Sequence, residues 1–309
     1  MNLLVTGAFP WTEEELNALR SLGHEVVFLQ QEQDELPCAA EWVEGIIGNG
    51  IFLSHSIEQF TNLRYVQLTS AGYDRVPMDY VKKHGIEIHN ARGVYSIPMA
   101  EFAICGVLQL YKQSGFFYDN QKNRKWEKNR GLLELYGKTV CIVGCGSVGS
   151  KCAKRFSAFG CKVIGVDIVP YKSYCYEKML PLDELKYALS EADITVLTLP
   201  LTDETRHIIN RDYFTAMKKG AVLVNIARGA VVDTDALILA LDSNLGGAVL
   251  DVFESEPLSE DSPLWDMANV LITPHNSFVG DGNHRRLFEL IIKNMEKYNH
   301  EDHSSGPKK

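Results

Sequence analysis

One short segment, 139–149 with the sequence TVCIVGCGSVG, constrains the fold of this 309-residue chain more than any other. Its first five residues are apolar and mostly β-branched, which is typical of a buried strand. The pattern G-x-G-x-x-G overlaps its end, and residues 150–159 then show helical periodicity. A second apolar strand ends at Asp167, eighteen residues after the last glycine of the pattern. A glycine-rich turn between a strand and a helix, with an acid at the tip of the next strand, predicts a dinucleotide-binding unit.

The glycines have separate physical roles in such a unit. Gly144 permits the tight turn, Gly146 lets a pyrophosphate approach the backbone, and Gly149 lets the helix pack close to the strand. The helix N-terminus offers N–H groups to the phosphates. Asp167 can accept hydrogen bonds from ribose hydroxyls and would repel a 2′-phosphate, which favours NAD over NADP. A glycine-rich turn without a ligand is the alternative for an isolated pattern. The loop residues expected to contact the cofactor are Gly144, Gly146, Ser147, Val148 and Gly149.

Composition and charge restrict the class of protein. The apolar content of 45% and charged content of 23% are ordinary for a soluble globular chain. A net charge of −9 disfavours nucleic acid or an anionic membrane as the main partner. No apolar run approaches the roughly 20 residues of a membrane span, and the N-terminus lacks the basic segment of a secretory signal. Seven cysteines without a C-x-x-C pattern indicate reduced thiols. We therefore expect a cytoplasmic protein, and we predict no metal site.

Two α/β domains are expected from the length and from the alternation of strands and helices. Residues 1–96 alternate strands and helices, which predicts a smaller parallel α/β domain, and the lack of a glycine-rich fingerprint indicates that this domain does not hold the dinucleotide. Residues 97–275 contain the fingerprint and further strand–helix pairs, which predict a doubly wound parallel sheet. The helical pattern at 282–298 is expected to return to the first domain, so that 276–309 belong to it. Residues 300–309 are expected to form a polar tail.

Three ionisable side chains each come shortly after an apolar strand of the second domain. They are Arg228, Glu256 and His275. Ligands bind outside the C-terminal ends of parallel strands, so we expect all three in the crevice that holds the nicotinamide. An arginine offers a planar fork to a carboxylate beside a carbonyl. A protonated imidazole can donate to the carbonyl oxygen as hydride arrives, and a neighbouring carboxylate favours its charged form. Taken singly, each residue is also explained as a surface ion pair or a turn residue.

Residues 69–74, TSAGYD, follow a strand of the first domain. Small residues at the end of a strand can expose backbone N–H groups to a bound anion. An ordinary turn between a strand and a helix explains this segment equally well.

Together these motifs resemble the D-isomer-specific 2-hydroxyacid dehydrogenases, and the resemblance covers residues 1–298. It implies a doubly wound Rossmann dinucleotide-binding domain plus a smaller flavodoxin-like parallel α/β substrate domain, in the two-domain form without a regulatory domain. The residues that carry it are VGCGSVG (143–149), Asp167, LPLTDETRHIIN (199–210), NIARGAVVD (225–233), LDVFESEPL (250–258), TPH (273–275), SAGYD (70–74) and GVYSIPMAE (93–101).

The resemblance also implies roles for individual residues. His275 would be the acid/base, Glu256 would orient and charge it, and Arg228 would bind the carboxylate and carbonyl of the substrate. Ala71 and Gly72 would offer backbone amides to the substrate carboxylate. Further contacts with the cofactor are expected from Pro200, Thr205, Ala227 and Asp251.

Two functions of different classes are compatible with these residues. The first is an NAD-dependent oxidoreductase that interconverts a 2-keto acid and a D-2-hydroxy acid. The second is an NAD(H)-sensing binding protein, similar to the corepressor branch of the same family, without metabolic turnover. The resemblance further implies a homodimer built on the cofactor domain. The segment 113–135 carries apolar residues that a dimer could bury, although its polar part, 119–130, is also explained as a solvated connector.

Overall fold

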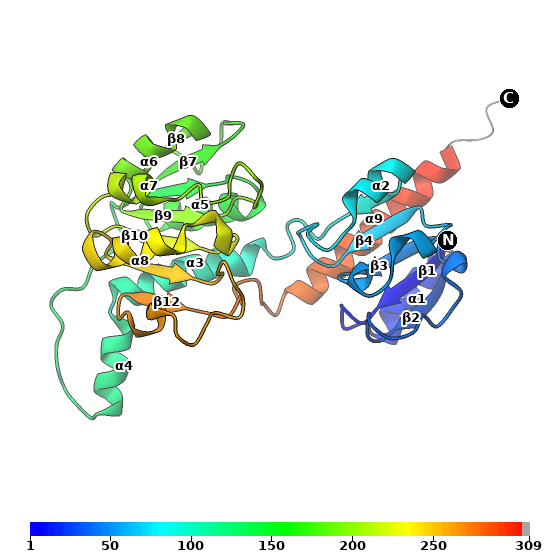
Figure 1. The fold of residues 1–309 in the computed structure, drawn as a ribbon, viewed down its shortest axis with the longest axis horizontal. Coiled ribbons are helices and arrows are strands. Elements are labelled where there is room, and N and C mark those ends of the chain that lie inside the picture. The colour runs from blue at the N-terminus through cyan, green and yellow to red at the C-terminus, as the bar shows by residue number, and fades with distance from the viewer. Residues whose placement is uncertain (305–309) are drawn as a thin grey trace. The chain divides into compact units, whose positions relative to one another are not determined.

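The computed structural model describes residues 1–304, and the chain forms two compact units (Figure 1). The first unit comprises Met1–Tyr95 together with the C-terminal segment that begins at Gly280. The second comprises Ser96–Val279. Ser96 and residues 276–279, which we expected in the first domain, fall within the second unit in this division. Within residues 1–304, no helix combines the length and the apolar character that a membrane span requires.

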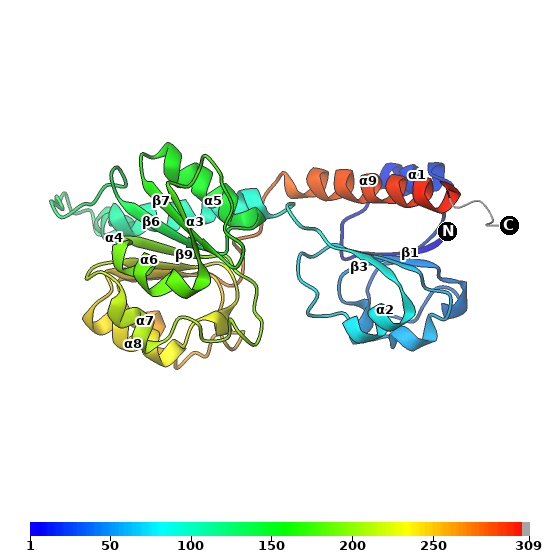
Figure 2. The same cartoon turned by 90° about the horizontal axis from the view of Figure 1, so that it is seen from above.

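The first unit is a five-stranded parallel sheet with the order β2-β1-β3-β4-β5. Helices α1 and α9 lie on one face of this sheet and α2 lies on the other (Figure 2). This order is the flavodoxin-like one, so the predicted fold class of the smaller domain is confirmed. The elements are β1 (Asn2–Thr6), α1 (Glu13–Ser21), β2 (Glu25–Leu29), β3 (Gly45–Gly48), β4 (Tyr65–Leu68), α2 (Met78–His84), β5 (Glu87–His89) and α9 (Asn283–Ser304), with 3₁₀ turns η1 (Ala40–Trp42), η2 (Ile51–Leu53) and η3 (Ile57–Gln59).

Helix α9 completes the core of the first unit because its apolar side chains recur at helical spacing. Leu287, Ile291 and Met295 are buried in one cluster with residues of β1 and α1. Each such side chain contributes about 1.5–3 kcal/mol when it is removed from water. The helix continues to Ser304, so the first part of the expected polar tail is helical. Residues 305–309 of that tail lie outside the described residues.

The second unit is a seven-stranded parallel sheet with the order β12-β11-β10-β9-β6-β7-β8. The strand order reverses between β6 and β9, as in a doubly wound Rossmann sheet, which confirms the predicted fold class. Its elements are α3 (Ser96–Tyr111), α4 (Ser114–Lys122), β6 (Thr139–Val143), α5 (Ser147–Ala158), β7 (Lys162–Asp167), β8 (Lys178–Pro181), η4 (Leu182–Glu184), α6 (Leu185–Glu191), β9 (Ile194–Leu197), α7 (Arg211–Ala216), β10 (Val222–Asn225), η5 (Gly229–Val231), α8 (Thr234–Ser243), β11 (Gly247–Leu250), η6 (Pro263–Asp266) and β12 (Val270–Ile272).

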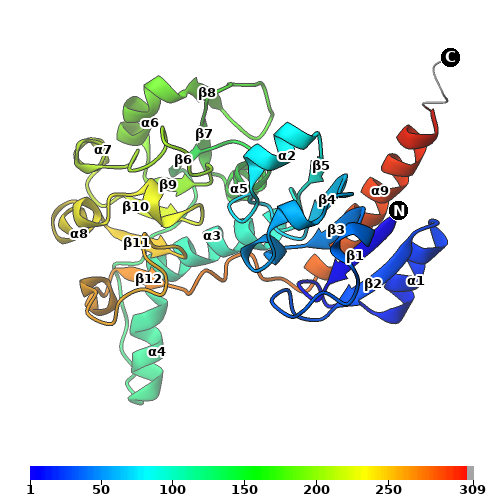
Figure 3. The same ribbon diagram turned by 45° about the vertical axis from the view of Figure 1, so that its right-hand side comes forward.

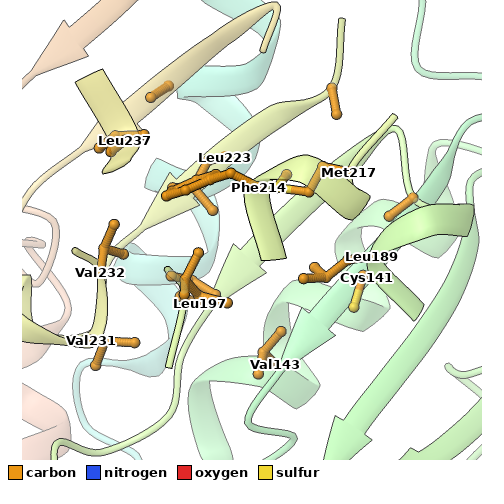
Figure 4. Packing of buried hydrophobic residues seen from close by; sticks show 14 of the residues in the cluster. Cys141, Val143, Leu189, Leu197, Phe214, Met217, Leu223, Val231, Val232 and Leu237 are labelled. Atoms are coloured by element: carbon orange, nitrogen blue, oxygen red, sulfur yellow. The ribbon is translucent and has the colours of Figure 1, made fainter. Parts of the chain in front are cut away.

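Two layers of helices bury the faces of the second sheet. Helices α3 and α5 cover one face, and α6, α7 and α8 cover the other (Figure 2). Figure 4 shows the second of these layers, where Leu197 of β9 and Leu223 of β10 lie among Leu189, Phe214 and Leu237 of the three helices. Dense packing of this kind keeps the strands rigid. The loops at the C-terminal edge of the sheet are therefore attached to a fixed base.

The sequence patterns did not predict α4 and β8. Helix α4 occupies the first part of the segment 113–135, whose polar part was interpreted as a subunit contact or a solvated connector, and Figure 3 shows it pointing away from the sheet. Its sequence, SGFFYDNQK, has no clear apolar stripe, so periodicity could not indicate a helix. Strand β8 has only four residues at the edge of the sheet, and its position depends on pairing with β7.

Candidate active site

The glycine-rich loop joins β6 to α5. Of its three glycines, Gly144 and Gly149 are closely surrounded by other atoms, whereas Gly146 has open space beside it. At Gly144 φ is 91°, and a β-carbon built there would lie 2.6 Å from the backbone nitrogen of Leu199. A β-carbon on Gly149 would lie 2.2 Å from the carbonyl oxygen of Gly144, so α5 packs closely against the loop. At Gly146 no described atom would lie within 4 Å of such a carbon. The loop therefore fits a pyrophosphate that approaches Gly146 at the N-terminus of α5.

Asp167 lies at the C-terminal end of β7, beside this loop. Its Oδ2 accepts a hydrogen bond of 2.7 Å from the Cys145 N–H, and its Oδ1 accepts one of 3.2 Å from the Val169 N–H. A carboxylate can accept about four hydrogen bonds, so two ribose hydroxyls fit as further donors. Burial raises the pKa of the Cys145 thiol to about 11. That thiol is only 2% exposed and stays protonated at neutral pH, so Cys145 packs the loop and is not a reactive group.

The loop after β9 is closed by the hydroxyl of Thr205. This hydroxyl donates to the carbonyl oxygen of Pro200 at 2.7 Å and accepts from the Thr202 N–H at 2.7 Å. Because Thr205 is buried, its side chain shapes the loop from within. Direct contacts of Pro200 and Thr205 with the cofactor stay predictions.

The turn after β10 presents Arg228 and is held by a buried asparagine. The Asn225 side chain accepts from the Ala227 N–H at 3.1 Å and donates to the carbonyl oxygen of Arg228 at 3.1 Å. The Arg228 side chain is half-buried, and its Nη1 donates to the carbonyl oxygen of Ala227 at 2.8 Å. Sequence reasoning singled out Arg228 and Ala227 but missed Asn225. An asparagine at a strand end, before a turn, is the signal that could have identified it.

His275 and Glu256, which follow β12 and β11, are hydrogen-bonded to each other, as the family resemblance implied. The Nδ1 of His275 lies 2.8 Å from Oε2 of Glu256, and Oε1 of Glu256 accepts from the Phe253 N–H at 3.0 Å. A carboxylate accepts, so Nδ1 is the donor and carries a proton. Within the described residues Nε2 has no hydrogen-bond partner. It is therefore the nitrogen that remains available to a ligand.

Asp251 fixes the backbone that carries His275. Its carbonyl oxygen accepts from the His275 N–H at 2.8 Å, and its fully buried carboxylate accepts from Thr273, Asn276 and Ser277 at 2.6–3.0 Å. His275 has φ of 50°, a left-handed conformation that a non-glycine residue keeps only when its surroundings impose it. Asp251 is thus a buried anchor of the turn, and its predicted contact with the nicotinamide stays a prediction.

A second acid, Glu254, connects the loop of Glu256 to two other loops. Its Oε2 accepts from His207 Nε2 at 2.7 Å, and its Oε1 accepts from the Thr234 N–H at 2.9 Å and the Thr234 hydroxyl at 2.6 Å. A β-carbon on Gly229 would lie 1.8 Å from the carbonyl carbon of Phe253, so the loops after β10 and β11 touch backbone to backbone. We call Glu254, His207 and Thr234 the latch. No sequence pattern pointed to it, because Glu254 and His207 are 47 residues apart.

The latch is expected to contribute to the reaction rate by positioning Glu256, which lies two residues further along the chain. Partial burial acts to raise the pKa of Glu254, but hydrogen bonds from Thr234 and His207 lower it below its ordinary value. The carboxylate of Glu254 is therefore charged near neutral pH, and the charged form is lost as the pH falls through that lowered pKa. Glu254→Gln should lower kcat for reduction by about three- to tenfold while NADH affinity is unchanged.

Steady-state kinetics and NADH titration of Glu254→Gln would check this expectation, with Glu260→Gln, an exposed acid of the same loop, as the control. A kcat equal to that of the control would show that the latch does not position Glu256.

In the first unit, the segment after β4 contains Ala71 and Gly72, whose backbone N–H groups are predicted to bind the substrate carboxylate. The carbonyl oxygens of Ala71 and Gly72 accept hydrogen bonds from Asn90 and Ser70, at 2.6 and 3.1 Å. Within residues 1–304, neither of their N–H groups donates to another protein group. This arrangement fits the predicted binding of a carboxylate at Ala71 and Gly72, which stays a prediction.

The chain is similar to known proteins over both units. Residues 104–277 match the family model described as D-isomer specific 2-hydroxyacid dehydrogenase, NAD binding domain. A glyoxylate reductase from Thermofilum pendens is 35% identical over 243 residues, which cover 76% of this chain and 71% of that protein. A hydroxypyruvate reductase from Blautia hydrogenotrophica is 32% identical over 253 residues, 78% of this chain and 77% of that protein. The crystal structure of D-lactate dehydrogenase from Aquifex aeolicus, complexed with NAD and lactic acid, matches with a TM-score of 0.79 at 28% identity. The match covers 98% of this chain and 97% of the D-lactate dehydrogenase chain.

These similarities agree with the motifs and with the fold. The family match includes the phosphate loop, Asp167 and the loops that carry Arg228, Glu256 and His275. The second unit is accordingly an NAD-binding domain, and the resemblance inferred from the sequence is confirmed. The chain belongs to the D-isomer specific 2-hydroxyacid dehydrogenase family and is an NAD-dependent oxidoreductase of small 2-hydroxy acids.

Proposed function

We propose that this protein acts mainly as a 2-keto acid reductase that forms a D-2-hydroxy acid, with His275 as the acid/base. The observation that carries the proposal is the 2.8 Å pairing of His275 Nδ1 with Glu256 at the C-terminal edge of an NAD-binding sheet. When bound, NADH supplies the hydride that reaches the carbonyl carbon. Nε2 of His275 supplies the proton to the carbonyl oxygen, and the charged carboxylate of Glu256 stabilises the imidazolium before that transfer. In the oxidative direction Nε2 accepts the proton.

Arg228 is proposed to bind the carboxylate and the carbonyl oxygen of the substrate. Its backbone is fixed by Asn225, and its guanidinium can present two parallel N–H donors to a planar group. The same cation stabilises negative charge as it develops on the carbonyl oxygen. Arg228 therefore acts on binding and on the transition state together.

Turnover with a panel of short 2-keto acids tests the proposal directly. The relatives named above are a glyoxylate reductase, a hydroxypyruvate reductase and a D-lactate dehydrogenase, so the panel should contain glyoxylate, hydroxypyruvate and pyruvate. We expect NADH oxidation with at least one of them and a D-configured product where the product is chiral. Tight NADH binding without turnover of any keto acid would contradict the proposal and would favour the NAD(H) sensor, which the named relatives do not favour.

We expect the enzyme to prefer NADH over NADPH because of Asp167. A 2′-phosphate would meet the carboxylate that now accepts from Cys145 and Val169. Asp167→Ser should raise the ratio of kcat/KM with NADPH to that with NADH by at least about tenfold, since like charges in contact cost more than 1.4 kcal/mol. Kinetics with both cofactors would measure the ratio. Equal kcat/KM values with the two cofactors in the unsubstituted protein would rule out this role of Asp167.

We also propose a homodimer formed through the cofactor domain. Large apolar side chains of α4 and the segment after it are exposed, and Trp126 is 98% exposed. Light scattering at micromolar concentration should give twice the chain mass of 34.7 kDa. Trp126→Ala should weaken the dimer by at least about tenfold, whereas Trp265→Ala, at another exposed tryptophan, should not. A monomeric mass for the unsubstituted protein would contradict the proposal. Of the apolar residues predicted to take part, Phe117, Trp126, Leu132 and Leu133 are exposed and Phe116 is half-buried.

A further inference from the structure

The carboxylate of Glu32 lies across the C-terminal ends of two neighbouring strands in the first unit. Its Oε1 accepts from the hydroxyl of Thr6, the last residue of β1, at 2.8 Å. The same oxygen accepts from the Asn49 N–H at 2.6 Å, and Oε2 accepts from the Gly50 N–H at 2.7 Å, both directly after β3. Three donors from two strand ends thus converge on one carboxylate.

Glycine at the end of β3 makes room for this carboxylate. A β-carbon on Gly48 would lie 2.7 Å from Oε1 of Glu32 and 3.0 Å from the hydroxyl oxygen of Thr6. Any larger residue at position 48 would therefore push Glu32 out of its place. The backbone around the carboxylate is shaped to receive a negatively charged group.

This place is the topological switch point of the smaller sheet. β1 pairs with β2 on one side and with β3 on the other, and β1 and β3 lie next to each other (Figure 1). In doubly wound sheets, ligands bind outside the C-terminal ends of the strands at this point, and in the flavodoxin-like order the point lies between β1 and β3. A side chain of the protein thus fills a position where such folds bind ligands.

The segment predicted to hold the substrate carboxylate borders the same place. Ala71 and Gly72 follow β4, which pairs with β3. Arg75, three residues after Gly72, has its Cδ 3.7 Å from the position that a β-carbon on Gly50 would occupy. The ends of β3 and β4 therefore lie side by side at one edge of the sheet, and a substrate group that extends from Ala71 and Gly72 toward β3 would meet the carboxylate of Glu32.

We propose that Glu32 is a specificity-determining residue that excludes a second negative charge on the substrate. Its carboxylate occupies the two N–H groups and the hydroxyl that a distal phosphate or carboxylate would otherwise use, and it repels such a group. The protein therefore selects short 2-keto acids with a single negative charge. This inference rests on the proposed keto acid reductase activity and on substrate binding at Ala71 and Gly72.

The test compares two substrates that differ only by a phosphate, hydroxypyruvate and 3-phosphohydroxypyruvate. In Glu32→Ala, the ratio of kcat/KM for the phosphorylated to the unphosphorylated substrate should rise about 10- to 100-fold, because like-charge contacts cost several kcal/mol. Glu32→Gln, which keeps the size of the side chain and one acceptor, should raise the ratio in the same direction by a smaller factor. Oxaloacetate against pyruvate should show the same trend for a distal carboxylate.

The ratio separates specificity from structural damage, since a loosened loop would affect both substrates alike. Glu35→Ala, which removes an exposed carboxylate from the same loop, is the matched control and should leave the ratio unchanged. An unchanged ratio in both Glu32 variants, while hydroxypyruvate is still reduced, would overturn this inference and leave the proposed function intact. Failure of the unsubstituted protein to reduce any keto acid would overturn the proposed function, and this inference with it.

Discussion

Replacing His275 with alanine is expected to lower kcat for keto acid reduction by about 10²–10⁴-fold, the usual contribution of a general acid. The loss is expected because Nε2 of His275 is the proposed proton donor, whereas Nδ1 is hydrogen-bonded to Glu256. NADH affinity should be unchanged, since the phosphates and the adenosine are expected to be held by the glycine-rich loop and Asp167. Single-turnover kinetics and a fluorescence titration with NADH would measure the two quantities.

The matched control for this substitution is His84→Ala, which removes an exposed histidine from α2 in the other unit. It should leave kcat within about twofold of the unsubstituted value. A His275→Ala enzyme that keeps most of its kcat would show that the proton comes from another donor.

Glu256→Gln tests the pairing itself through the pH profile. In the proposed reaction a proton on His275 is needed for reduction, and a negative charge on Glu256 would stabilise the imidazolium. Removing the charge while keeping the shape should move the alkaline limb of kcat/KM to lower pH, with activity retained in acid. An alkaline limb at the same pH as in the unsubstituted enzyme, under conditions where chemistry limits the rate, would show that the 2.8 Å contact does not control the protonation of His275.

Replacing Arg228 with alanine is the second change with a large expected effect. Both KM and kcat should deteriorate, and kcat/KM should fall by about 10²–10³-fold, because the guanidinium is proposed to bind the substrate carboxylate in the ground state and the transition state. Arg228→Lys should recover only part of the loss, since an ammonium cannot form two parallel hydrogen bonds to a planar group. Steady-state kinetics over a wide range of keto acid concentration would separate KM from kcat.

Arg211→Ala provides the control for charge alone, because Arg211 is exposed at the start of α7 in the same unit. Its kinetic constants should match those of the unsubstituted protein. Full recovery by lysine at position 228 would contradict the bidentate clamp and would leave only a requirement for positive charge.

Much of the fold could be predicted because it depends on local patterns. A strand, a glycine-rich turn and a helix between residues 139 and 158 are determined by apolar runs, by steric freedom at glycine and by helical periodicity. The capping box of α1, in which Thr12 and Glu15 exchange hydrogen bonds, is likewise a local pattern. Helix α4 and strand β8 were missed for the complementary reason, since neither has a pattern of its own.

In the candidate site, too, local sequence patterns predicted some features and missed others. Arg228, Glu256 and His275 could be selected as candidates because each comes after an apolar strand, and parallel strands bring their C-terminal ends to one edge of a sheet. The latch could not be predicted, because Glu254 contacts His207 across 47 residues of sequence.

By itself, the sequence determined most of the succession of strands and helices along the chain, the phosphate loop and the identity of the residues proposed to carry out the chemistry. These depend on side-chain type and on spacing along the chain, which a sequence records directly. Only the tertiary structure decided which atoms form hydrogen bonds with one another. Nδ1 of His275 contacts Glu256, the carbonyl oxygen of Asp251 accepts from the His275 N–H, and Glu32 accepts from groups at the ends of β1 and β3. Hydrogen bonds act over about 3 Å, whereas these partners are 17 to 26 residues apart, and packing of the strands brings them together.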